Sequence, residues 1–285
     1  MQSTSFFGHE ISRLIVGDNP FTGHSYIEHK ITGKEMKAYY DSKRLYEVLF
    51  KIEEAGYTCM MPLAHPFNVQ IIREYKRDGG KLQFIFQPYE AMDQRVMMRE
   101  LDDIEPIGIY HQGTNADMYF EIGRCDEIRR QIAEYHTMGI PVGLGTHRPE
   151  VIELAEKEGW DVNFYVACLQ NARRGRAGEA SGFLTGKTKQ GLVFYPEDRP
   201  IMLDMISKVQ KPCIAFKIFA GGQLLLAEDP EEVKECIRNV YREVFSKLKP
   251  SDVAAIGVFN KYHDQISEDA ALFEEVMQEM ASGMK

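Results

Sequence analysis

The run Ile107-Gly108-Ile109-Tyr110 is followed, beyond an amphipathic segment over residues 127–138, by Gly139-Ile140-Pro141 and the run Val142-Gly143-Leu144. Each apolar run is short enough for a buried strand and is bounded by turn residues, whereas the segment between them has helical periodicity. The stretch therefore predicts a strand–helix–strand unit, the unit from which parallel sheets are built.

The same alternation continues along the whole chain. Short apolar runs occur at residues 14–16, 57–61, 82–86, 107–110, 142–144, 162–167, 213–216 and 253–258. Amphipathic helical patterns cover residues 41–56, 68–78, 127–138, 149–159, 231–248 and 266–282. Eight such repeats predict a single (β/α)₈ TIM-barrel domain over residues 1–285. An open doubly wound sheet is the alternative, but no Gly-x-Gly-x-x-Gly motif follows the first apolar run.

The composition narrows the classes of partner. The chain has 285 residues, and 34 Lys and Arg against 43 Asp and Glu give a net charge of −9, which argues against nucleic acid. No apolar run approaches the length of a membrane span, and residues 1–10 lack the features of a signal peptide. The five cysteines are scattered and form no C-x-x-C pair. We therefore expect a cytoplasmic protein with reduced cysteines and a small-molecule substrate; the sequence leaves open whether it is a homo-oligomer.

Two connections are too long to be plain linkers, and both follow strands. They cover residues 18–40 and 171–199, so in a barrel both lie on the C-terminal face, where active sites of this fold occur. The second contains the basic residues Arg173, Arg174, Arg176, Lys187 and Lys189. We interpret it as a lid that attracts an anionic substrate, against the alternative of a solvated insertion.

Six short segments together resemble the aldo-keto reductase superfamily. They are residues 7–14 (its N-terminal hairpin), 53–57, 109–111 (its fourth strand, ending in a catalytic His), 140–146, 215–222 and 264–269. The resemblance implies a barrel whose bottom is closed by a hairpin and whose mouth holds the site.

The catalytic tetrad of that superfamily is largely missing from this sequence. Its Asp falls near Met61, its Tyr near His65 or Pro66 and its Lys at Gln87, so that only His111 matches. No Arg or Lys stands at residues 263–265, where the superfamily commonly grips the adenosine 2′-phosphate. We therefore expect NADP to bind more weakly than about 100 μM, since one lost charge-assisted contact lowers affinity about ten- to a hundredfold.

Polar residues at the C-terminal ends of the predicted strands are the candidate site. The candidates for substrate binding are Asp18, Asn19, Gln87, His147, Gln170, Asn171, Arg173 and Asn260. Gly221 and Gly222, after the seventh strand, are the candidate cofactor-phosphate loop. His65, His111 and His147 give one further hypothesis, a divalent metal such as zinc held by three imidazoles. No spacing motif for a metal supports it.

His111 and Lys217 are the favoured catalytic residues, together with His65. An imidazole can transfer protons at physiological pH because its pKa lies near neutrality. A cation on the opposite side of the substrate would stabilise a developing oxyanion. The sequence thus predicts an enzyme, an isomerase or lyase in a barrel like that of the aldo-keto reductases, that acts on a small polar carbonyl or sugar-like metabolite. Two alternatives stay open: an NAD(P)-dependent oxidoreductase with His65 as a new proton donor, and a catalytically silent barrel that binds a ligand.

Overall fold

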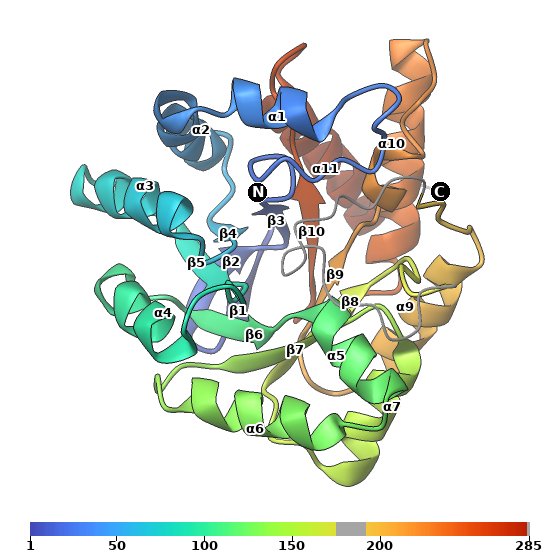
Figure 1. The fold of residues 1–285 in the computed structure, drawn as a ribbon. Helices are drawn as coiled ribbons and strands as arrows, with labels where there is room; N and C mark the ends of the chain where they lie inside the picture. The colour runs from blue at the N-terminus through green and yellow to red at the C-terminus, as the bar shows by residue number, and fades with distance from the viewer. Residues whose placement is uncertain (175–191, 284–285) are drawn as a thin grey trace.

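A computed structural model describes residues 1–174 and 192–283. Eight parallel strands form a closed barrel in the order β10-β3-β4-β5-β6-β7-β8-β9 (Figure 1). Their bounds are β3 Leu14–Gly17, β4 Cys59–Met61, β5 Gln83–Phe86, β6 Gly108–His111, β7 Val142–Thr146, β8 Phe164–Cys168, β9 Cys213–Phe216 and β10 Val253–Gly257. The predicted TIM barrel is confirmed, with each strand at the expected place, and the open sheet is excluded because β10 pairs with β3.

Helices surround the barrel (Figure 1). They are α1 Gly33–Tyr39, α2 Ser42–Glu54, α3 Pro66–Arg77, α4 Gln94–Leu101, α5 Gly113–Glu121, α6 Cys125–His136, α7 Pro149–Glu158, α9 Asp198–Lys208, α10 Pro230–Phe245 and α11 Gln265–Ser282. The sequence signals at their ends work as expected: the Asp41 carboxylate caps α2 by accepting from the Arg44 N–H at 2.9 Å, and Gly159 ends α7 at a φ of 64°. Helices α1, α4, α5 and α9 were not predicted.

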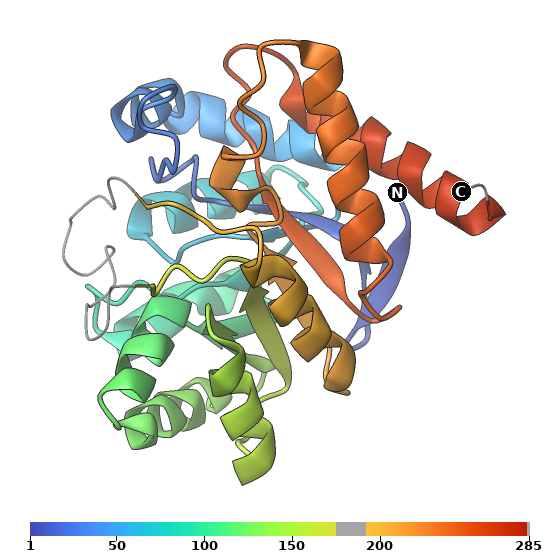
Figure 2. The ribbon, with the colours of Figure 1, turned by 90° about the vertical axis from the view of Figure 1, so that its right-hand side faces the viewer.

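The N-terminal hairpin closes the bottom of the barrel. Strands β1 Ser3–Phe6 and β2 His9–Ser12 pair antiparallel at the end opposite α1 (Figure 2). Phe6 is 5.1 Å, between ring centroids, from Phe164 inside the barrel. Gly143 leaves room for that ring, because a Cβ atom there would come within 2.4 Å of it. The lower part of the interior is therefore occupied by packed apolar side chains, Phe6 and Phe164 among them, and the C-terminal mouth is left for a ligand.

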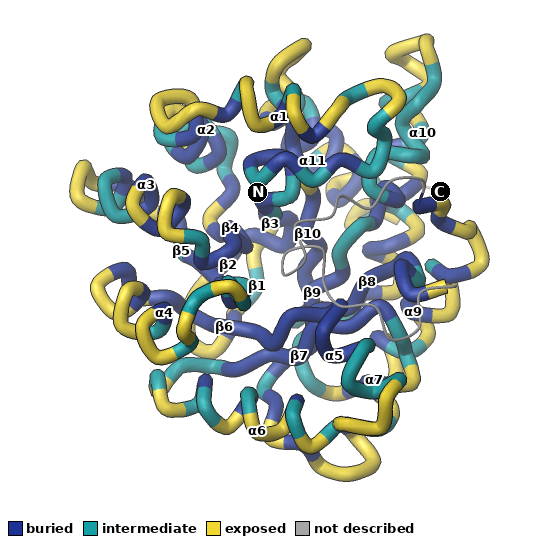
Figure 3. The backbone as a smooth tube through the Cα atoms, in the orientation of Figure 1, coloured by how far each residue is buried: buried dark blue, intermediate teal, exposed yellow. Residues whose placement is uncertain are grey.

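Alternating residues of each strand belong to two apolar layers. Ile85, Tyr110 and Val166 belong to the barrel interior, whereas Leu14, Ile109 and Leu144 pack against the helices. Exposed residues gather on the outer faces of the helices (Figure 3). A shift of one residue along a strand thus moves a side chain from the interior to the helical layer. Within the two described ranges, no helix combines the length and apolar character needed to cross a bilayer.

Candidate active site at the barrel mouth

A cavity of about 660 Å³ opens at the C-terminal ends of the strands. Six of the residues expected to bind substrate or cofactor, or to act in catalysis, line it: Asp18, Asn19, Gln87, Lys217, Gly221 and Gly222. Tyr26 and Tyr110 line it as well. Its size falls in the range of small-molecule sites, about 300–1,000 Å³.

Lys217 follows β9 in an unusual backbone conformation. Its φ is 56°, in the left-handed region, which costs a non-glycine residue on the order of 1 kcal/mol and often marks a functional site. Its ammonium nitrogen lies 4.9, 5.3 and 5.7 Å from the ring centroids of Tyr26, Phe216 and Phe194. Burial lowers the pKa of Lys217, but Cys168, Tyr26 and Asp117 more than offset this, and the pKa is raised. The three rings favour the same protonated state.

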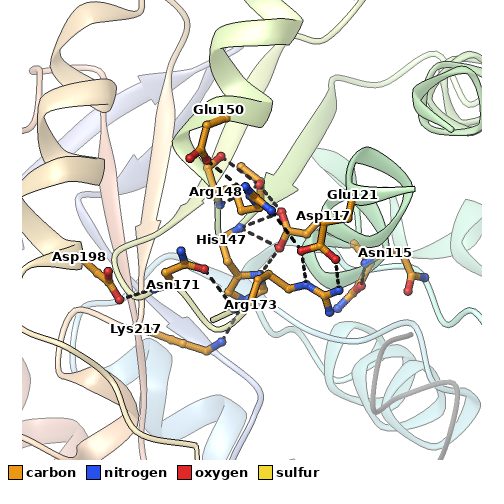
Figure 4. Close-up of polar contacts among 12 residues, drawn as sticks. Asn115, Asp117, Glu121, His147, Arg148, Glu150, Asn171, Arg173, Asp198 and Lys217 are labelled. Carbon is orange, nitrogen blue, oxygen red and sulfur yellow. Dashed lines mark hydrogen bonds and ion pairs between the residues drawn. The ribbon is translucent and has the colours of Figure 1, made fainter. Parts of the chain in front are cut away.

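His147 connects Lys217 to a buried carboxyl group (Figure 4). The Lys217 Nζ atom lies 3.1 Å from His147 Nε2, and His147 Nδ1 lies 2.8 Å from Asp117 Oδ2. Asp117 also accepts hydrogen bonds from the His147 backbone N–H at 3.2 Å and from the Thr146 hydroxyl. The first residues of α5 and the end of β7 thus fix a line of three titratable side chains, Asp117–His147–Lys217.

This line has two arrangements of its protons. In one, Lys217 is an ammonium that donates to Nε2, and Nδ1–H donates to an ionised Asp117. In the other, one proton has moved from Lys217 to Nε2 and another from Nδ1 to Asp117, so that Lys217 is a free amine. Burial raises the pKa of Asp117 to about 7, so its carboxyl group can take up a proton near neutral pH. Because the pKa of Lys217 is raised, the arrangement with the ammonium is the favoured one.

A second layer of ion pairs supports the line from behind (Figure 4). The Glu121 carboxylate binds the Arg173 guanidinium, with Oε1 to Nε at 3.1 Å, and the Arg148 Nη1 at 3.2 Å. The side chain of Arg173 is only 2% exposed. Arg174 pairs with Asp198. Two of the five basic residues assigned to anion attraction are therefore paired with carboxylates; Arg176, Lys187 and Lys189 lie outside the described residues.

A second polar group lines the cavity at the ends of β3, β5 and β6. Asp18 Oδ2 accepts from the Leu63 N–H at 2.6 Å, and burial raises the pKa of Asp18 to about 7. The Tyr110 hydroxyl donates to Gln87 Oε1 at 3.1 Å. Burial, aided by the nearby Asp18, raises the pKa of Tyr110 well above its usual value. Near neutral pH the cavity thus holds an acid that titrates, a phenol that stays protonated and a cation.

Similar barrels occur in solved structures. The holo form of an aldo-keto reductase from Bacillus halodurans superimposes with a TM-score of 0.57 at 12% identity, over 100% of this chain and 97% of that one. The glycerol dehydrogenase of Gluconobacter oxydans gives 0.55 at 11% identity, over 99% and 96% of the two chains. The chain shares its fold with aldo-keto reductases. Dihydropteroate synthase from Yersinia pestis, a different kind of enzyme, is similar at a TM-score of 0.54 and 9% identity, over 98% of each chain. No protein-family model matches the sequence, and no curated protein does.

The expected orientation of His111, toward the mouth, is wrong. Its ring is fully buried, 6.5 Å between centroids from Tyr119 of α5 and beside Gln131 of α6. Because side chains alternate along β6, the inward side chain at this strand end is that of Tyr110. Burial lowers the pKa of His111 to about 4, so its imidazole is neutral at physiological pH. We therefore do not carry His111 forward as the acid–base group.

The three histidines do not converge on a metal. His65 begins α3, where its Nδ1 accepts from the Phe67 N–H at 3.2 Å and its ring lies 4.8 Å from that of Tyr89. His111 faces the helices and His147 faces Lys217. Among the described residues, no group of three His, Cys, Asp or Glu side chains could hold a metal ion. The zinc hypothesis is therefore wrong for these side chains.

The remaining candidates make structural contacts outside the cavity lining. Asn260 Oδ1 accepts from the Ile266 N–H at 3.0 Å in the first turn of α11. Asn171 Oδ1 accepts from the Arg173 N–H at 3.1 Å. Gln170 is buried, and its side-chain oxygen has no hydrogen-bond partner within residues 1–174 and 192–283.

Three residues of the site were missed by the sequence analysis: Asp117, Tyr110 and Tyr26. Asp117 belongs to α5, which directly follows the end of β6, and therefore lies beyond the strand-end positions that a barrel directs toward its mouth. The polar residues Thr114, Asn115 and Asp117, all buried at the start of α5, are the signal that could have found it. Tyr26 lies in the long connection after β3, where no periodicity marks a cavity-facing position.

Proposed function

We propose that the chain is an enzyme that moves a proton on a small carbonyl compound bound beside Lys217, as an isomerase or lyase would. One observation carries the proposal: the cavity-lining ammonium of Lys217 is 3.1 Å from His147 Nε2, and the buried Asp117 lies behind that imidazole. Such an arrangement holds a positive charge and a proton where a substrate oxygen binds.

The proposed chemistry uses Lys217 and Asp18. The Lys217 ammonium donates a hydrogen bond to the carbonyl oxygen and stabilises the negative charge that develops there. The Asp18 carboxylate takes the proton from the adjacent carbon, which gives an enolate (an enediolate where that carbon bears a hydroxyl group) and a protonated Asp18. Asp18 then returns the proton to the same carbon or to its neighbour. A pKa of about 7 suits a group that must accept and release a proton near neutral pH.

Exchange of carbon-bound hydrogen tests this step. We would incubate the protein in D₂O with a panel of aldehydes, ketones and hydroxyketones and follow deuterium uptake next to the carbonyl by NMR. We expect Lys217→Met to slow uptake at least about a hundredfold, the lower end for a positioned proton-transfer group. Lys208→Met is the matched control, because Lys208 is exposed on α9 and pairs with Asp204. Uptake that is equal in both variants would reject the proposal.

A second experiment separates two roles for Lys217. Treatment with borohydride in the presence of a carbonyl substrate reduces an imine to a stable adduct that intact-mass measurement detects. We expect no adduct, because the raised pKa and the surrounding rings keep Lys217 protonated. An adduct that maps to Lys217 would make the lysine a covalent nucleophile. If no carbonyl compound exchanges, the silent ligand-binding barrel is favoured.

Nicotinamide-dependent reduction is the second candidate function. The fold it shares with aldo-keto reductases and the protonated phenol of Tyr110 in the cavity favour it. Gly221 and Gly222 line the part of the cavity where a phosphate group would bind. The lining of the same cavity carries Glu228 and Glu268, which repel phosphate; of its cations, Lys234 pairs with Glu231, and Lys30 is a further one. We therefore still expect NADPH to bind more weakly than about 100 μM in a fluorescence titration. A low-micromolar constant would favour the reductase.

A further inference from the structure

The cavity continues from Lys217 into a part that we call the apolar arm. It is lined by Ile27, Ile31, Leu225, Val233, Ile237 and Phe259. The proposed function uses only the polar end of the cavity, at the strand ends. The arm is therefore a binding region that the proton-transfer step leaves without a role.

The arm is built from four separate parts of the chain. Ile27 and Ile31 come from the long connection after β3, Leu225 from the connection after β9, Val233 and Ile237 from α10, and Phe259 from the end of β10. Ile237 is 2% exposed and Phe259 is 6% exposed. Ile27, Ile31, Leu225 and Val233 are half-buried, so the arm has a packed floor and partly exposed sides.

The arm starts directly beside Lys217. Ile218 follows Lys217 in the chain and lines the cavity, and Tyr26, next to Ile27, lies 4.9 Å from the Lys217 ammonium. Gly222 packs closely there, because a Cβ atom on it would be 3.4 Å from Ile27. A molecule with its carbonyl oxygen on Lys217 therefore has apolar side chains around the part that extends away from the strand ends.

The charged residues at the rim of the arm do not offer a phosphate site. Lys234 Nζ lies 2.9 Å from Glu231 and 3.6 Å from Glu268. His263 Nε2 lies 3.3 Å from the same Glu268 carboxylate. Glu228 adds a further carboxylate to the lining. A pyrophosphate would meet the Glu228 and Glu268 carboxylates, and Lys234 and His263 are already paired with carboxylates. Lys30, whose Nζ lies 3.5 Å from the Leu226 carbonyl oxygen, is a lining cation that it could meet. With two carboxylates against that cation, the arm suits a neutral apolar group better than a dinucleotide.

We propose that the apolar arm binds the hydrocarbon body of an amphiphilic carbonyl compound whose carbonyl group lies at Lys217. This inference rests on the proposed function for the position of the carbonyl group. It narrows the substrate class away from sugars, because hydroxyl groups in the arm would lose hydrogen bonds to water and find few partners in return.

A homologous series of ketones tests the arm. We would measure binding of the 2-alkanones from 2-butanone to 2-decanone by calorimetry, and deuterium exchange on the same compounds. Each added methylene should strengthen binding about three- to fourfold, since burying one is worth about 0.8 kcal/mol, until the arm is full. Affinity that does not change along the series would overturn the inference.

Two variants locate the effect. Val233→Trp fills the arm, so the ratio of affinities for 2-decanone and 2-butanone should fall at least tenfold. Asn239→Trp adds the same side chain at an exposed position of α10 outside the lining and should leave that ratio unchanged. An unchanged ratio in Val233→Trp, or displacement of bound 2-decanone by low-micromolar NADPH, would overturn the inference.

The same data distinguish this inference from the proposed function. Chain-length-dependent binding without any exchange would support the arm and reject the proton transfer. Exchange that depends on Lys217 but not on chain length would support the proton transfer and reject the arm.

Discussion

Two buried aspartates of this protein, Asp117 and Asp269, are in opposite situations. Both are almost inaccessible to solvent, and burial raises the pKa of Asp117 to about 7 and of Asp269 to about 8. Asp117, at the barrel mouth, accepts hydrogen bonds from Thr146 and from two donors of His147. Asp269, in α11, has no hydrogen-bond partner for either carboxyl oxygen among the described residues, and Tyr57, Tyr241 and Glu268 interact with it electrostatically.

The two aspartates differ in the hydrogen-bond donors around them: Asp117 has several, and Asp269 has none in the part of the chain that the structure describes. A buried carboxyl group with several donors is held in one orientation and can act on its neighbours. One without donors stays protonated and costs stability, because the unfolded chain would ionise it in water. A raised pKa alone therefore does not identify a functional acid; the donors around Asp117 make the distinction.

The largest expected effect is the difference in deuterium uptake between Asp117→Asn and Asp269→Asn. Asp117→Asn replaces the carboxylate that accepts from His147 Nδ1–H. The His147 ring then no longer has a fixed orientation and protonation, and its hydrogen bond with Lys217 is disturbed. Deuterium uptake should fall at least about a hundredfold, and its pH profile should lose the step that Asp117 contributes near pH 7. Asp269→Asn is the matched control and should leave uptake within about threefold, because Asp269 itself does not line the cavity. Equal losses in both variants would remove the functional distinction between the two sites.

The pH dependence of stability tests whether Asp269 is protonated in the folded chain; Asp117, whose pKa is also raised by burial, contributes a slope of the same sign. Between about pH 4 and pH 8 the unfolded chain has lost the Asp269 proton while the folded chain keeps it, so stability falls as pH rises and levels off above about pH 8. Asp269→Leu removes this term and should reduce the slope by about 1.4 kcal/mol per pH unit. Urea unfolding at several pH values from 5 to 8, each about one unit apart, measures the slope. Identical slopes in the variant and the parent would show that Asp269 is already ionised in the folded chain.

The smallest effect concerns neighbouring residues on β6. Tyr110→Phe removes a hydroxyl group from the cavity, where it donates to Gln87, and should slow deuterium uptake by up to about tenfold, the upper end for one lost hydrogen bond between neutral groups. His111→Leu changes the side chain that faces the helices and should alter uptake less than about threefold. Melting temperatures of both variants would show whether either change acts through folding. A larger loss for His111→Leu than for Tyr110→Phe, at unchanged stability, would restore His111 as an acid–base group.

The strands were predictable because eight apolar runs and their turns leave little freedom. The helices that were missed have physical reasons. α1 has seven residues inside a long connection, and the first half of α5 is buried throughout, so neither shows a clear amphipathic pattern.

The site was only partly predictable. Asp18, Gln87 and Lys217 were found because the strand ends of a barrel face the mouth. The resemblance to aldo-keto reductases led to a wrong orientation for His111. It matched the residue type at the end of the strand, but the side chain of His111 faces the helices and that of Tyr110 faces the barrel interior. The link between Asp117 and His147 joins α5 to the end of β7 and depends on packing that no spacing in the sequence records.

The closure of the barrel has a consequence for the synthesis of the chain. β10 is the last barrel strand to leave the ribosome, and it pairs with β9 on one side and with β3 on the other. Asp18 follows β3 and Lys217 follows β9, so the two groups assigned to the chemistry stand on either side of that final strand. Before β10 is made, β3 and β9 have open edges, which are prone to pairing with other chains. Activity would then require nearly the whole polypeptide, and a nascent chain stalled before β10 would be both inactive and prone to aggregate.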